Sequence, residues 1–123
     1  MDELIARLVA NVGVEKVAAE KAVGIILDFL SKEGPPDKVQ PLIDKLPGAA
    51  ALIKAQQASD AGGGGMFAMG GLMGAGTKMM AAGLSMGQVQ AVTKEVIAYS
   101  REKAGEDAIG EIVGAIPGLS QFV

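Results

Sequence analysis

Residues 85–118 read SMGQVQAVTKEVIAYSREKAGEDAIGEIVGAIPG, and this stretch decides the fold. Its first apolar residues recur three, four and three positions apart, the period of one helix face: Val89, Val92, Val96 and Tyr99. The pattern S-x-x-Q at the start of the stretch is a capping box. Gly105 is expected to end this long helix, and Asp107 to cap a shorter helix that stops at the Pro-Gly pair 117–118.

The first half of the chain repeats this plan at a constant offset of seventy residues. Residues 15–48 read EKVAAEKAVGIILDFLSKEGPPDKVQPLIDKLPG. The long helix is predicted to end at the Gly-Pro-Pro run 34–36, and Asp37 to cap the short helix, with Pro41 near its first turn. One interpretation is an ancient duplication, and the other is that any two pairs of a long and a short helix align this well. The predicted capping aspartates and the Pro-Gly pairs of the two halves also match at this offset, which favours the duplication.

Further helices are predicted on either side of these pairs. Leu4, Ile5, Leu8 and Val9 have helical spacing and are followed by Gly13, and residues 49–58 can form another helix. We therefore predict an all-α fold, a small helical bundle of two related halves with pseudo-twofold packing. The single domain 1–123 divides into a first helical half (1–60), a Gly/Met-rich segment (61–83) and a second helical half (84–123).

The middle of the chain is unusual in composition. Residues 61–93 contain one charged residue, Lys78, together with ten glycines and six of the seven methionines. Three interpretations compete. The segment is a linker whose helical ends pack on the core, an adhesive surface that pairs with itself or with a partner protein, or a membrane-associated element using residues 61–93. The runs without charge are too short and too rich in glycine for a spanning helix of about 20 apolar residues.

The adhesive interpretation gives a specific set of contact residues. Nearly uncharged apolar surface is a liability on a monomer, which favours a homo-oligomer or a protein partner over a membrane. The predicted partner-binding residues are Met66, Phe67, Met69, Leu72, Met73, Met79 and Met80.

Three stretches carry a resemblance to a known family. These are residues 100–123, SREKAGEDAIGEIVGAIPGLSQFV, residues 32–48, KEGPPDKVQPLIDKLPG, and the Gly/Met-rich spacer between the halves. Together they resemble a bacterial domain-of-unknown-function family of small all-helical proteins. The resemblance rests on the general pattern of residue types and on the Pro-Gly pairs that follow the two short helices, and it covers most of the chain. It implies an all-α fold in a bacterial protein and implies no activity, substrate or site residues.

Composition excludes several classes of chemistry. The chain has no histidine, cysteine or tryptophan, which excludes disulfides, cysteine-ligated metal sites and triads that need histidine. A net charge of −3 argues against nucleic-acid binding. Glu102, Glu106, Asp107 and Glu111 lie close in sequence, but acids in a first helical turn favour the helix dipole, so we expect no metal site. We expect a non-enzymatic protein without a cofactor.

The N-terminal residues bear on the compartment. They read MDELIARL, with two acids first and an arginine within the apolar run. A secretory signal has a basic start and an uninterrupted apolar core instead. We therefore expect a cytoplasmic protein.

Overall fold

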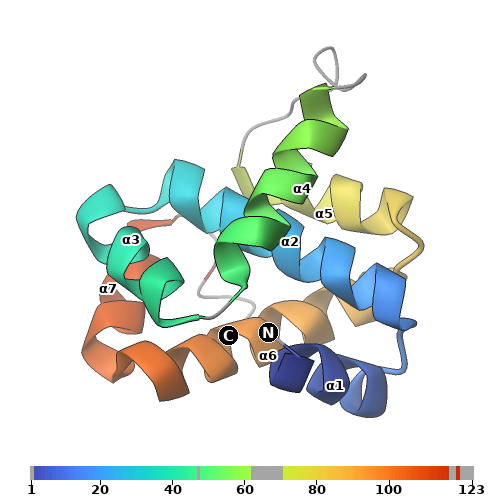
Figure 1. Ribbon diagram of the computed structural model, residues 1–123, viewed down its shortest axis with the longest axis horizontal. Coiled ribbons are helices and arrows are strands. Elements are labelled where there is room, and N and C mark those ends of the chain that lie inside the picture. Colours follow the sequence, from blue (N-terminus) through green and yellow to red (C-terminus); the bar gives the residue numbers. More distant parts are fainter. Residues whose placement is uncertain (1, 47, 62–70, 117–118, 120–123) are drawn as a thin grey trace.

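Helix α2 (Lys16–Glu33) runs through the centre of the molecule, and most of the other described helices pack on it (Figure 1). The computed structural model describes residues 2–46, 48–61, 71–116 and 119, without the side chains of residues 36, 57–61, 71–73 and 75. These residues form seven α-helices and no strand, so the predicted all-α bundle is confirmed.

Burial differs between the two long helices. Nine consecutive residues of α2, from Ala22 to Leu30, are buried, which is the pattern of a helix covered on every side. Helix α6 (Met86–Ala104) buries one face, through the predicted stripe of residues 89, 92, 96 and 99 and through residues 93, 97 and 100. The capping box of α6 is also confirmed. The Ser85 Oγ accepts from the Gln88 backbone N–H at 3.3 Å, and the Gln88 Oε1 accepts from the Ser85 backbone N–H at 2.9 Å.

The helix bounds follow the offset of seventy residues. Helix α6 starts seventy residues after α2, and α7 (Glu106–Ala115) both starts and ends seventy residues after α3 (Pro36–Lys45). The hydrogen bonds that end the two short helices match as well. The backbone N–H of Leu46 donates to the Ile43 carbonyl at 3.1 Å, and that of Ile116 donates to the Val113 carbonyl at 3.3 Å.

The offset also relates two helices that the sequence pattern left unmatched. Helix α1 (Asp2–Asn11) and helix α5 (Gly71–Ala81) end seventy residues apart. Each is followed by a glycine in the left-handed region, Gly13 at φ 82° and Gly83 at φ 107°, which residues with a side chain rarely adopt. The next residue is buried in both cases, Val14 in one half and Leu84 in the other. The offset therefore relates two units of three helices, α1 to α3 and α5 to α7, and α5 belongs to the Gly/Met-rich segment.

Helix α4 (Ala49–Ala61) departs from this repeat. Helix α1 packs on α6 and α5 packs on α2, as a twofold exchange of the halves would require. Helix α4, however, crosses α2 and also contacts α3, and no described helix packs in the same way on α6 (Figure 1). The pseudo-twofold packing therefore stays a prediction.

Three sequence predictions about the first turns of helices are wrong. The N-cap residue of α3 is Pro35 and that of α7 is Gly105, so Asp37 and Asp107 lie inside the first turn instead. There their negative charge still favours the helix dipole. Proline suits the first position of a helix, so α3 starts earlier than predicted and Pro41 lies in its interior. Gly105, at φ 96°, both ends α6 and starts α7.

Candidate functional site

The structure separates the predicted contact residues into four groups. Met66, Phe67 and Met69 lie outside the described residues, and Leu72 and Met73 lie on α5 with side chains outside the description. Met79 is buried in the core at 1% exposure, so its prediction as a surface contact residue is wrong for this chain. Met80, the next residue, is 48% exposed. The difference is one of helix phase, because adjacent residues point about 100° apart around the axis.

Four large apolar side chains are exposed in the described part of the chain, all near helix ends, and we call this set the end patch. They are Val9 (41% exposed), Val17 (59%), Met80 (48%) and Met86 (58%). Val9 and Met80 lie near the C-terminal ends of α1 and α5, while Val17 and Met86 lie near the N-terminal ends of α2 and α6. These helix ends gather on the right of Figure 1. Val17 also lines one cavity together with Ala81 and Ala82, which places the start of α2 beside the end of α5.

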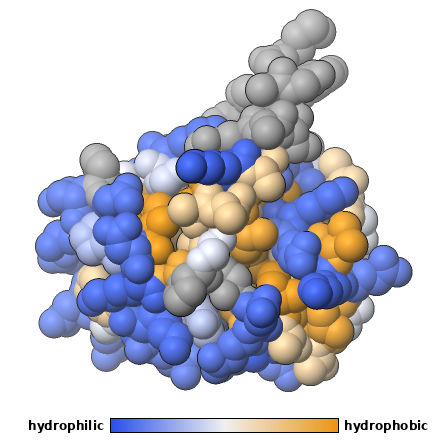
Figure 2. All heavy atoms as spheres, viewed as in Figure 1, coloured by the Kyte–Doolittle hydropathy of each residue, from blue (hydrophilic) through white to orange (hydrophobic). Residues whose placement is uncertain are grey.

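Sequence periodicity missed three members of the end patch. Val17 and Met86 fall between the positions of the apolar stripes, which leaves them on the outer faces of α2 and α6. The sequence pattern places Val9 on the apolar face of α1, and its exposure shows that this prediction is wrong. Charged and polar residues, Glu15, Lys16, Ser85 and Gln90, adjoin the patch in sequence and are exposed. Figure 2 shows apolar surface on this side of the molecule interrupted by hydrophilic residues.

Two of the four acidic residues near Gly105 form ion pairs between helices. The Arg7 Nη1 donates to the Glu102 Oε2 at 2.6 Å, which joins α1 to α6. The Lys38 Nζ lies 2.9 Å from the Glu111 Oε2, which joins α3 to α7. Within the described ranges, no group of three or more acidic side chains is placed to hold a metal ion.

A small aromatic and cationic cluster covers one side of α6. The Arg7 guanidinium lies 5.7 Å from the centre of the Tyr99 ring, and the Lys103 ammonium lies 5.4 Å from it. Both distances are within the range of cation–π attraction. Hydrogen bonding to Glu102 raises the pKa of Arg7. The cluster ties α1 to the second half of the chain, which is a structural role.

The Lys38–Glu111 pair makes a prediction about pH. The hydrogen bond to Glu111, together with the attraction of its charge, raises the pKa of Lys38 above its ordinary value of 10.5. The stability from this pair is therefore present below pH 10.5 and is lost as the pH rises through the raised pKa. We expect Lys38→Met to lower the thermal midpoint slightly at neutral pH, with the difference vanishing at strongly alkaline pH. Thermal unfolding of both proteins across this range tests it, and a constant difference would contradict it.

Known proteins add no further information on the site. Compared with family models, with curated proteins and with solved structures, the chain matches none. The resemblance to a bacterial helical family therefore stays a hypothesis that rests on the quoted residues.

Proposed function

We propose that this protein is a non-enzymatic helical interaction protein, working in the cytoplasm, that self-associates through its Gly/Met-rich segment and the adjoining end patch. The observation that supports this is that four exposed apolar residues, Val9, Val17, Met80 and Met86, all lie near helix ends that gather on one side of the molecule. Exposed apolar groups that cluster inside a polar surround are the usual anatomy of a protein interface. Met80 belongs to segment 61–83, and Met86 follows it closely.

Methionine suits the proposed role for a physical reason. Its unbranched, polarisable side chain adapts to irregular apolar partners at low strain. Four apolar residues are fewer than the roughly 20–30 residues that each side of a standard interface provides. The exposed polar residues that adjoin the patch therefore have to join the contact, and we expect an interface with an apolar centre and a polar rim.

A membrane-associated role is the alternative. Among the helices that the structure describes, none is long and apolar enough to cross a bilayer. The alternative then requires the end patch to lie on a lipid surface. The basic residues that usually accompany such surfaces are balanced by acids here, since Glu15 directly precedes Lys16 at the start of α2. This charge balance favours a protein partner.

Light scattering of the purified chain in buffer without detergent tests the proposal. We expect a discrete dimer or larger closed oligomer for the wild type, and a monomer for the double variant Met80→Asp, Met86→Asp. A charge on each of two exposed residues makes burial at an interface unfavourable while leaving the core intact. Substitution is a cleaner test than deletion of residues 61–83, because the deletion removes α5 and the buried Met79.

The matched control is Ala50→Asp, Ala51→Asp, which adds the same charge on exposed positions in the first turn of α4. Acidic residues are favourable there, and this control should keep the wild-type mass. A wild-type monomer would contradict self-association, and a double Met variant that kept an oligomeric mass would contradict the end patch as its surface. Polydisperse material that detergent resolves and that sediments with lipid vesicles would support the membrane alternative instead.

A further inference from the structure

A cavity of about 460 Å³ opens where α2, α4 and α5 meet. Slightly more than half of its wall is apolar, with Val17 and Ile25 from α2, Leu52 and Ala55 from α4, and Ala82 just after α5. Its volume lies within the range of roughly 300–1,000 Å³ that is common for small-molecule sites, and such sites combine apolar walls with a few polar groups. The cavity is thus of a size and composition to hold a small organic molecule.

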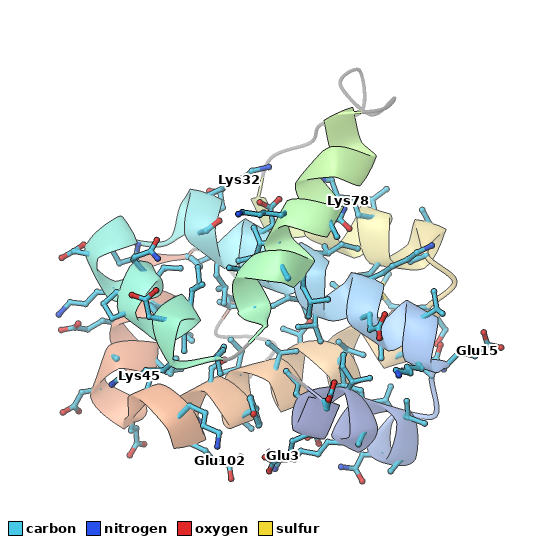
Figure 3. All side chains as sticks on the ribbon, viewed as in Figure 1. Glu3, Glu15, Lys32, Lys45, Lys78 and Glu102 are labelled. Atoms are coloured by element: carbon cyan, nitrogen blue, oxygen red, sulfur yellow. The ribbon has the colours of Figure 1, made fainter. Side chains whose placement is uncertain are left out.

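The polar groups of the cavity have a net positive charge. Lys21 on α2 and Lys78 on α5 both line it, together with Glu20 and the amide of Gln56. Counted over the lining residues alone, two lysines against one glutamate give a formal charge of +1. Lys78 is half-buried, and Figure 3 shows it where α4 passes α5. It is also the one charged residue of residues 61–93. Lys78 and Gln56 already have interactions within the chain, so a ligand would share these groups.

The cavity depends on the helix that breaks the internal repeat. Seventy residues after Lys21 and Ile25, the second half has Ala91 and Glu95, and no described helix crosses α6 there as α4 crosses α2. Neither the cation nor the apolar wall is therefore repeated at these positions. The combination is therefore absent from the positions of α6 that correspond to Lys21 and Ile25.

We propose that this cavity binds a small amphipathic carboxylate, a molecule with a short alkyl chain and one carboxylate group. The alkyl chain packs against the wall formed by Ile25 and Leu52, where burial of methylene groups is favourable. The carboxylate accepts charge-assisted hydrogen bonds from the ammonium groups of Lys21 and Lys78, which are stronger than neutral hydrogen bonds. This inference goes beyond self-association and does not depend on it.

Octanoate is a suitable probe, used below its micelle-forming concentration and followed by the backbone amide shifts of the full-length chain. We expect saturable shifts at the residues that line the cavity. Octan-1-ol lacks the negative charge of octanoate, and octylammonium has a positive charge instead. We expect each of them to bind at least about tenfold more weakly than octanoate, because each loses at least one charge-assisted hydrogen bond. Octylammonium binding as tight as octanoate would overturn the proposal, as would octanoate shifts that do not saturate.

Three variants locate the site. Lys78→Glu is expected to weaken octanoate binding by at least about tenfold, while Lys94→Glu makes the same charge change at an exposed position of α6 and should leave binding unchanged. Ala55→Leu keeps the charge and narrows the cavity from an exposed helical position, so it should also weaken binding. Equal affinities in all three variants would overturn the proposal. Binding is expected to persist in the Met80→Asp, Met86→Asp protein, which separates this result from the test of self-association.

Discussion

Replacing Gly24 with alanine is expected to lower the free energy of unfolding by about 1–3 kcal/mol, the usual effect of overpacking. A Cβ atom at this position would lie 2.9 Å from the Leu52 carbonyl oxygen and 3.5 Å from the Gln56 Cβ. The nearest atom is backbone of α4, so the contact is relieved only if α4 moves as a whole. The higher helix propensity of alanine, worth about 0.5–1 kcal/mol, opposes the loss without cancelling it.

Gly110→Ala is the matched control for this prediction. Gly110 lies inside α7, is exposed, and has no atom within 4 Å of the position that a Cβ would take. Here only helix propensity acts, so we expect a gain of about 0.5–1 kcal/mol. Urea unfolding of the two variants should therefore give shifts of opposite sign. If Gly24→Ala also stabilised the protein, α4 would not lie against α2 at the distance that the structure shows.

Local hydrogen exchange adds a second measurement for Gly24→Ala. Helix α4 packs mainly on α2, so displacing it should expose its amide groups before the rest of the protein unfolds. We expect faster exchange in α4 in the variant, with little change in α7. The exchange pattern then reports which helix the added methyl group displaces.

The long and short helices could be predicted because side-chain pattern alone determines them. The stripe from Val89 to Tyr99, the Ser85 capping box and the offset of seventy residues all reappear in the structure. The predicted caps at Asp37 and Asp107 failed because proline and glycine compete for the same helix starts. Pro36 suits a first helical position, and Gly105 adopts a positive φ that links two helices.

Helices α4 and α5 could be predicted only in part because side-chain pattern says little about them. Helix α4 has few large apolar residues. It lies close to α2 because Gly24 has no side chain, and the periodicity of apolar residues does not reveal such a contact with the backbone. Helix α5 is rich in glycine, and its sequence does not distinguish the buried Met79 from the exposed Met80. The cavity escaped prediction for the same reason, since α2, α4 and α5 form it jointly.

The buried centres of the two long helices make the second large prediction. Leu27 on α2 and Ile97 on α6 are seventy residues apart in sequence and are both fully buried. Truncation of either side chain to alanine removes apolar contacts and leaves a cavity, which typically lowers the free energy of unfolding by about 2–5 kcal/mol. Lys94→Ala serves as a control. Because Lys94 is exposed on α6 and lies outside the end patch, its truncation should change the free energy of unfolding by less than about 0.5 kcal/mol.

Leu27→Ala also tests whether the two halves unfold as one unit. The chain has a single tyrosine, Tyr99, which lies on α6, so tyrosine fluorescence reports on the second half alone, whereas circular dichroism reports on all the helices. Helix α2 contacts α6, and Arg7 on α1 joins Tyr99 and Glu102, so the contacts that hold α6 come partly from the first half. We therefore expect Leu27→Ala to lower the urea midpoint equally by both probes. A tyrosine transition that stayed at the wild-type midpoint while the dichroism shifted would show instead that the second half is stable without the first.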